Sequence, residues 1–262
     1  MADSLYVYAV VGAPAPDPLG TGIDGLPLRA VVAGALAAVV HEHSGPAYGG
    51  GPEEVRRRAL EHNGVVERLW RTERAIVPMA FDVIVASAAP TTAEDRLRTW
   101  LAGAASGIAA RLGAVRGRVE LRADLGLDRA AAAASDEEVQ RLREEAATAS
   151  PGVARLVQKR IQRRERDVAE HLADALYPSV RRRLAAASAE LVEHRRTTAE
   201  PGESLLLSAS LLVDEEAVPL VGAELSHIGD EEPAVRIRFY GPWPPYSFAD
   251  LGEDAGPAGT AG

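Results

Sequence analysis

Hydrophobic and polar residues alternate along several short stretches of the first half of the chain. This two-residue period is typical of β-strands that bury one face. It predicts strands at residues 5–11, at 75–85 with an interruption near Pro78, and at 115–121, and residues 28–32 and 36–40 most simply form a hairpin.

Two stretches between these strands instead repeat their apolar residues every three or four positions, as helices do. Pro52 is well placed as the first residue of one helix, which continues to about Leu69. Thr91 and Glu94 form a capping box for the next helix, which Gly113 is expected to end. Residues 1–125 therefore predict an N-terminal α+β sandwich that resembles a ferredoxin-like arrangement with an added strand.

The second half of the chain has a different pattern. Residues 126–134 are rich in alanine and charge and are expected to be a linker. Residues 135–248 then predict a C-terminal α+β domain with long helices and a small sheet. Its helices begin at a capping box of Ser135 and Glu138 and again at Pro151, and heptad spacing continues past Pro178 to Leu191. Residues 249–262 are acidic and glycine-rich, which predicts a disordered tail.

Composition narrows the choice of function. The chain has 262 residues, a formal net charge of -9 and no cysteine. The negative charge argues against general binding of nucleic acid or of anionic membranes. The lack of cysteine excludes disulfides and thiolate metal sites and fits a reducing cytoplasm. We expect no signal peptide and no membrane-spanning stretch.

Catalytic, cofactor and metal signatures are missing from the sequence. His41 and His43, two residues apart near a strand end, could face one side like metal ligands, but the third and fourth ligands of a zinc site are not evident. We therefore expect two surface histidines there, and a hydrogen-bonded core histidine at His62. No nucleotide-binding or hydrolase motif is present. We predict no metal, no cofactor and no enzymatic activity.

One arginine-rich helix provides an alternative function. The stretch from Arg155 to Arg166 reads RLVQKRIQRRER and is the best candidate for a nucleic-acid surface, so a nucleic-acid-binding regulator is the alternative hypothesis. Its basic residues are spread around the helix and no aromatic residues are interleaved for base stacking. Glu165, Asp167 and Glu170 are close enough to pair with them. A solvated helix surface is therefore favoured.

The last predicted strand runs directly into a proline-rich segment. Three of the five residues in GPWPP are prolines, which lack a backbone N–H donor and have a fixed φ angle. We therefore expect sheet pairing to stop and a stiff polyproline-type rod to follow. The rod presents two aromatic rings on one side. It is expected to pack internally as a clamp, with docking of a partner as the alternative. Its residues are Gly241, Pro242, Trp243, Pro244, Pro245, Tyr246 and Phe248.

This C-terminal octapeptide, GPWPPYSF, is similar to the C-terminal signature of the gas vesicle protein GvpL/GvpF family. Earlier landmarks resemble that family in the same order: YVYAVV, GALAAVV, His62 with VV and VPM, and SPG before the long helices. The resemblance implies a non-enzymatic, cytoplasmic accessory or minor structural protein of gas vesicle assembly. It also implies binding to the small hydrophobic shell protein or to other accessory proteins.

One departure from the family concerns Ala80-Phe81-Asp82, where members commonly carry Arg-Phe-Gly. The same region provides a candidate partner patch, because a hydrophobic partner is expected to need an apolar surface. Alternation in an extended strand would place Met79, Phe81 and Val83 side by side. A central buried strand is the alternative interpretation.

Overall fold

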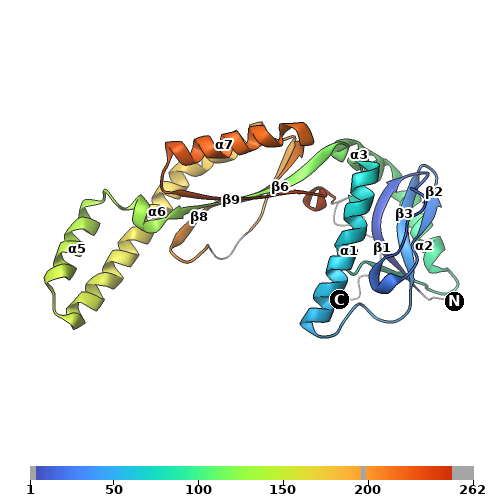
Figure 1. Cartoon of the computed structure of the whole chain (residues 1–262), viewed down its shortest axis with the longest axis horizontal. Coiled ribbons are helices and arrows are strands. Elements are labelled where there is room, and N and C mark those ends of the chain that lie inside the picture. The colour runs from blue at the N-terminus through green and yellow to red at the C-terminus, as the bar shows by residue number, and fades with distance from the viewer. Residues whose placement is uncertain (1–3, 196–198, 250–262) are drawn as a thin grey trace. The chain divides into compact units, whose positions relative to one another are not determined.

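The computed structural model describes residues 4–195 and 199–249 of the chain. These residues form two compact units, each described here by itself (Figure 1). The first unit contains residues up to 120 together with the C-terminal segment from residue 242. The second unit contains residues 121–241. The expected tail, apart from Ala249, lies outside the described residues.

The sheet of the first unit is antiparallel, with strand order β2-β3-β1-β4 and with β5 also paired to β1. β1 is its central strand, and its register with β3 shifts between Val7 and Ala9. This bulge brings Val10 onto the same face as Leu5 and Val7, because it inserts one extra residue into the alternation. The strands are β1 (Ser4–Gly12), β2 (Arg29–Ala33), β3 (Leu36–His43), β4 (Val77–Pro78) and β5 (Ile84–Ala86).

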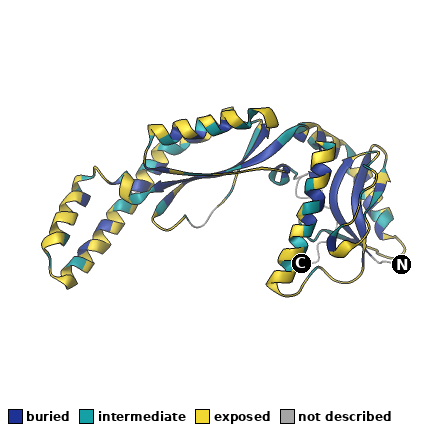
Figure 2. Ribbon diagram, in the orientation of Figure 1, coloured by how far each residue is buried: buried dark blue, intermediate teal, exposed yellow. Residues whose placement is uncertain are grey.

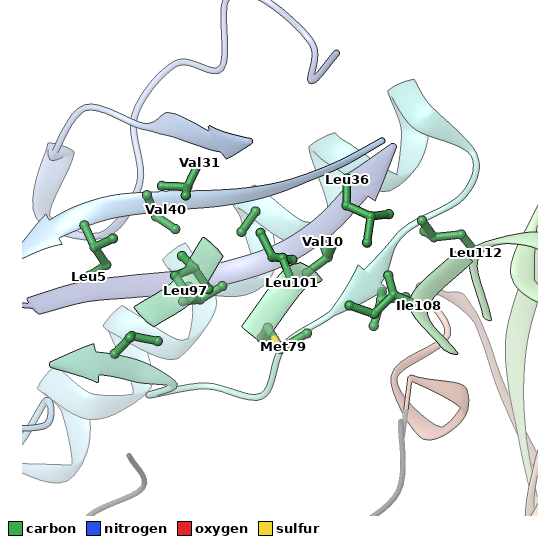
Figure 3. Packing of buried hydrophobic residues seen from close by; sticks show 14 of the residues in the cluster. Leu5, Val10, Val31, Leu36, Val40, Met79, Leu97, Leu101, Ile108 and Leu112 are labelled. Carbon is green, nitrogen blue, oxygen red and sulfur yellow. The ribbon is translucent and has the colours of Figure 1, made fainter. Parts of the chain in front are cut away.

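The main apolar core of this unit lies between the sheet and two short helices (Figure 3). Leu97 and Leu101 of α2 (Ala93–Gly103) and Ile108 of α3 (Ala105–Val115) are fully buried against strand residues. The other face of the sheet meets α1 (Pro52–Glu73), which buries His62, Val65 and Val66. A short turn, η1 (Ile23–Gly25), completes this face.

The second unit is built on a four-stranded sheet with order β7-β8-β6-β9. Its strands are β6 (Arg118–Asp128), β7 (Glu190–Glu193), β8 (Glu203–Asp214) and β9 (Val235–Trp243). Figure 1 shows α7 (Val218–Glu231) and part of α6 (Pro151–Ala186) along one side of this sheet. The short elements α4 (Arg129–Ala132), η2 (Glu215–Ala217) and η3 (Tyr246–Phe248) complete the chain.

The first half of α6 forms an antiparallel hairpin with α5 (Glu137–Thr148). Its core is small: Ala133, Val139, Leu142, Val157 and Ile161 are the buried residues of this cluster. Most other side chains of the hairpin are exposed (Figure 2). Polar pairs between the two helices therefore carry part of their contact.

The α+β class predicted from the sequence is confirmed, since antiparallel sheets and helices make up both units. Several element boundaries differ. Residues 126–134, expected to be a linker, contain the end of β6 and α4, because β6 continues as a buried strand to Asp128. The strand expected over residues 75–85 is divided after Pro78, close to the predicted interruption, but its two parts are short. The helix expected to end at Gly113 instead breaks at Ala104 and continues to Val115.

The long helix also differs from the prediction at its end. α6 passes through Pro178 without interruption and ends at Ala186, so Leu191 belongs to β7 instead. At the C-terminus, β9 continues through Gly241 and Pro242 to Trp243. The expected stop at Gly241 is therefore wrong, because an edge strand tolerates proline where no partner needs its missing donor.

Candidate functional site

A cluster of seven aromatic rings lies on the α1 side of the sheet in the first unit. Tyr6 and Tyr8 alternate along β1 with the core residues, so their rings point away from the main core. Tyr6 is paired directly with His41 on β3, and the two rings stack with centroids 5.0 Å apart. The members are Tyr6, Tyr8, His41, His43, Tyr48, His62 and Phe81.

His62 is held by a hydrogen bond at each ring nitrogen. Nε2 lies 3.1 Å from the Met79 carbonyl oxygen, which can only accept, so Nε2 carries the proton. Nδ1 then accepts from the Tyr6 hydroxyl at 2.9 Å. The same hydroxyl accepts from the backbone N–H of Asp82 at 3.0 Å. This chain of bonds fixes one neutral tautomer of His62.

His41 lies between two tyrosines. Tyr8 Oη is 2.8 Å from its Nδ1 and Tyr48 Oη is 3.1 Å from its Nε2. Tyr8 also accepts from the backbone N–H of Ile23 at 2.8 Å. Gly22 makes this approach feasible, because a Cβ there would lie 2.2 Å from the Tyr8 oxygen.

Asp82 closes the cluster from the loop between β4 and β5. Its φ of 74° lies in the left-handed region, which glycine adopts most readily. Its carboxylate accepts from the Tyr48 backbone N–H at 3.0 Å, which offsets the strain. In the departure at Ala80-Phe81-Asp82, the aspartate thus adopts a backbone conformation that glycine favours and accepts a hydrogen bond from the Tyr48 N–H. Arg58 covers the Tyr48 ring at 4.9 Å.

Burial disfavours the charged forms of His41, His62, Tyr6 and Tyr8. Desolvation lowers the pKa of His62 to about 4. The pKa of His41 is also lowered to about 4, mainly by desolvation and further by the nearby His43. Burial raises the pKa of Tyr6 and of Tyr8 above the ordinary tyrosine value. These four rings are therefore neutral at pH 7, and their polar atoms bond to one another.

The histidine predictions met different outcomes. His62 is, as expected, a hydrogen-bonded core residue with 1% exposure. The expectation of surface positions for His41 and His43 is wrong, because they are 0% and 4% exposed. Among residues 4–195 and 199–249, no group of three or more His, Asp or Glu is arranged to hold a metal ion. Sequence reasoning missed the tyrosines, although the Tyr-x-Tyr and His-x-His spacings were available as a signal.

The C-terminal motif contacts residues of the first unit. Tyr246 donates to Asn63 Oδ1 at 3.0 Å, and Ser247 donates twice to the buried carboxylate of Glu120, through its N–H at 2.8 Å and its hydroxyl at 2.6 Å. Phe248 is 1% exposed. Pro244 and Pro245 are buried, and residues 246–248 form a 3-10 turn instead of a polyproline rod.

Trp243 behaves differently from the rest of the motif. It is 46% exposed, so the expectation of a fully packed ring is wrong at this position. The anchors of the segment are Tyr246, Ser247 and Phe248. Trp243 and Tyr246, which were expected on one side of the rod, thus differ in burial: Trp243 is exposed and Tyr246 is half-buried.

The candidate patch of Met79, Phe81 and Val83 is divided by the structure. Met79 is buried in the main core, and Val83 packs against it. Phe81 instead lies against Tyr6, Tyr48 and His62 in the ring cluster. The segment is a loop between two short strands, so strand alternation does not apply to it. We do not retain the patch as a partner surface.

The arginine-rich stretch 155–166 lies on α6. Some of its charged residues form ion pairs with residues in or next to α5, and others lie on exposed positions. Arg164 pairs with Asp136 at 2.7 Å, and Glu165 pairs with Arg143 of α5 at 2.7 Å. Pairing with α5 thus replaces the pairing along one helix that the sequence suggested for Glu165. Arg155 and Arg163 lie on exposed positions of the helix.

The fold places the chain in a known class of α+β proteins. Its structure resembles two crystal structures of gas vesicle protein GvpF. The one from Anabaena sp. PCC7120 has a TM-score of 0.65 and 16% identity, covering 94% of this chain and 96% of that one. The one from Microcystis aeruginosa has a TM-score of 0.66 and 17% identity, covering 95% and 99%.

Sequence comparison defines the family. The family model for gas vesicle synthesis protein GvpL/GvpF matches residues 4–250, and the chain belongs to this family. Gas vesicle protein L2 of Halobacterium salinarum is 27% identical over 95% of this chain and 92% of the relative. Gas vesicle protein L of Haloferax mediterranei is 26% identical over 88% of this chain and 74% of the relative. The protein is accordingly gas vesicle-associated. In the described part of the chain, no helix is long and apolar enough to span a bilayer.

Proposed function

We propose that this protein is a non-enzymatic, cytoplasmic accessory or minor structural protein of gas vesicle assembly. It binds the small hydrophobic shell protein, other gas vesicle accessory proteins, or both. Family membership over residues 4–250 supports the assembly role. In the ring cluster, the nitrogens of His41 and His62 bond to tyrosine hydroxyls and a backbone carbonyl, which suits a structural role for these two side chains.

The observation that carries the binding proposal is the exposure of Trp243 within a motif whose neighbours are buried. Its ring is 46% exposed, whereas Phe248 is 1% exposed. A half-exposed tryptophan next to an anchored backbone loses little freedom on binding, which suits it to an apolar partner. Residues 244–248 thus hold the segment on the first unit, and Trp243 contacts the partner.

The experiment compares two aromatic truncations in the full chain. Trp243→Ala should leave thermal unfolding nearly unchanged and weaken capture of tagged shell protein by at least about tenfold, as for an interface hot spot. Phe248→Ala should lower the free energy of unfolding by about 3–5 kcal/mol, because it deletes a buried aromatic. Leu60→Ala is the matched control, since Leu60 is also exposed on the first unit at 62%.

Two results would contradict the proposal. Failure of the unmodified chain to capture either the shell protein or an accessory protein would remove the binding role. Trp243→Ala with a lowered melting temperature and intact capture would make Trp243 a packing residue instead.

A further inference from the structure

One face of α6 carries six charged residues in a symmetrical order. Three basic residues come first and three acidic residues follow, with spacings of four, three, one, three and four. At 100° per residue they fall within an arc of about 100° of the helix. The residues are Lys159, Arg163, Arg166, Asp167, Glu170 and Asp174.

This face is distinct from the side of α6 that meets α5. The buried residues Val157 and Ile161 lie on the side that meets α5. Arg164 forms an ion pair with Asp136 on that side. Five of the six residues of the symmetrical face are exposed and Asp167 is half-buried. None of the six forms a salt bridge with another residue in the part of the chain that the structure describes.

We propose that this face binds the same face of a second copy of the chain. Two α6 helices packed antiparallel, with a two-fold axis between positions 166 and 167, bring each basic residue opposite an acidic one. Lys159 then faces Asp174, Arg163 faces Glu170 and Arg166 faces Asp167 of the partner copy. Each pair occurs twice, because a two-fold interface is isologous.

The charge pattern selects a second copy over other occupants. A nucleic acid would be attracted by the first half of the face and repelled by Asp167, Glu170 and Asp174. A uniformly acidic protein segment would meet the same repulsion. A second copy satisfies both halves in one register. In that register Leu156, which is 64% exposed, lies opposite Tyr177 and adds apolar contact at each end.

The association is expected to be weak and sensitive to salt. Exposed ion pairs contribute little individually, and screening shortens their range to about 10 Å at 0.1 M salt and about 3 Å at 1 M. Raising the salt from about 0.05 M to about 0.5 M should therefore weaken self-association by tenfold or more.

The test uses two reversed faces of the full chain. Lys159→Glu/Arg163→Glu/Arg166→Glu makes the face wholly acidic, and Asp167→Lys/Glu170→Lys/Asp174→Lys makes it wholly basic. Sedimentation equilibrium at low salt should show self-association of the unmodified chain, monomers for each variant alone, and a heterodimer when the two are mixed. Circular dichroism confirms that each variant retains its helices.

Two single changes keep the test valid if a triple variant fails to fold. Arg163→Glu should weaken self-association by at least tenfold, and adding Glu170→Arg to the same chain should restore it. Arg155→Glu is the matched control, because this position would face Pro178 and has no acidic mate. A monomeric unmodified chain at all concentrations, or variants that associate alone or fail to associate when mixed, would overturn the proposal.

Discussion

The ring cluster of the first unit and the α5–α6 hairpin of the second unit use polar groups in opposite ways. In the cluster, neutral hydroxyls and imidazoles are buried and bond to one another. In the hairpin, full charges lie at the surface around five buried apolar residues. The hydrogen bonds of the cluster are stronger in its low-dielectric surroundings and are lost when a ring becomes charged. The ion pairs of the hairpin form in contact with water and become weaker as the salt concentration rises.

The stability of the two regions can be measured separately in the intact chain, because a different spectroscopic or exchange signal reports on each of them. All three tryptophans, Trp70, Trp100 and Trp243, belong to the first unit. Tryptophan fluorescence therefore reports on the first unit, and hydrogen exchange along α5 reports on the hairpin. Acid and salt should separate the two signals.

The largest expected effect is the loss of stability of the first unit in acid. The pKa values of His41 and His62 fall from 6.5 in the unfolded chain to about 4 in the folded one. The unfolded state thus binds more protons below pH 6.5, so the free energy of unfolding falls between pH 6.5 and about 4. Each histidine contributes about 1.4 kcal/mol per pH unit at most. Urea unfolding followed by fluorescence measures this.

His62→Gln provides the control for the acid effect. The variant should show a shallower slope over the same pH range, because it lacks the contribution of His62. An identical slope in both proteins would assign the acid sensitivity to other groups, such as paired carboxylates.

The next effect concerns a single hydroxyl. Tyr6→Phe leaves the ring but removes the group that joins His62 Nδ1 to the Asp82 N–H. Leaving two buried polar groups unpaired should lower the free energy of unfolding by about 1–3 kcal/mol. Tyr177→Phe removes an exposed hydroxyl bonded to Glu193 and should change it by less than about 0.5 kcal/mol. Equal losses of unfolding free energy in the two variants would contradict this prediction, because the buried hydroxyl would then contribute no more to stability than the exposed one.

A smaller effect is expected in the hairpin. Arg164→Ala removes the exposed ion pair with Asp136 and should cost less than about 1 kcal/mol, seen as faster hydrogen exchange along α5. The difference should disappear at about 1 M salt, where screening is nearly complete. A larger cost that persists in salt would mean that Arg164 acts through packing instead.

The smallest expected signal is binding to duplex DNA. The acidic side chains on the solvent face of α6 and the net charge of -9 should make it negligible at physiological salt. Fluorescence anisotropy with a labelled duplex measures it. Sub-micromolar binding with a steep salt dependence would revive the regulator hypothesis and contradict the two-copy arrangement of α6.

Local patterns predicted much of the fold. The strand 5–11 and the hairpin after it were found because their alternation is strong and their turn contains a glycine. The caps lie one position later than the sequence predicts: the structure uses Thr92 with Asp95, and Asp136 with Val139. Adjacent candidates of similar capping strength cannot be separated without the tertiary contacts.

The candidate site was harder to predict. His41 and His43 lie on a strand whose pairing with Tyr6 depends on register, and His62 comes from a helix, so only the folded chain brings these residues together. The C-terminal segment is held by the hydrogen bonds that Ser247 donates to Glu120. Glu120 is 127 positions away from Ser247, and no local pattern connects them.

The attachment of Ser247 to Glu120 also affects the order of events during synthesis. The first unit needs residues that follow the whole second unit in the chain, so it can be completed only after residues 121–241 have left the ribosome. Translation at about 5–20 residues per second delays its closing segment by roughly 6–24 seconds. During this interval the site that receives Phe248 stays uncovered on the nascent chain. The second unit can finish folding first, although the first unit begins earlier in the sequence.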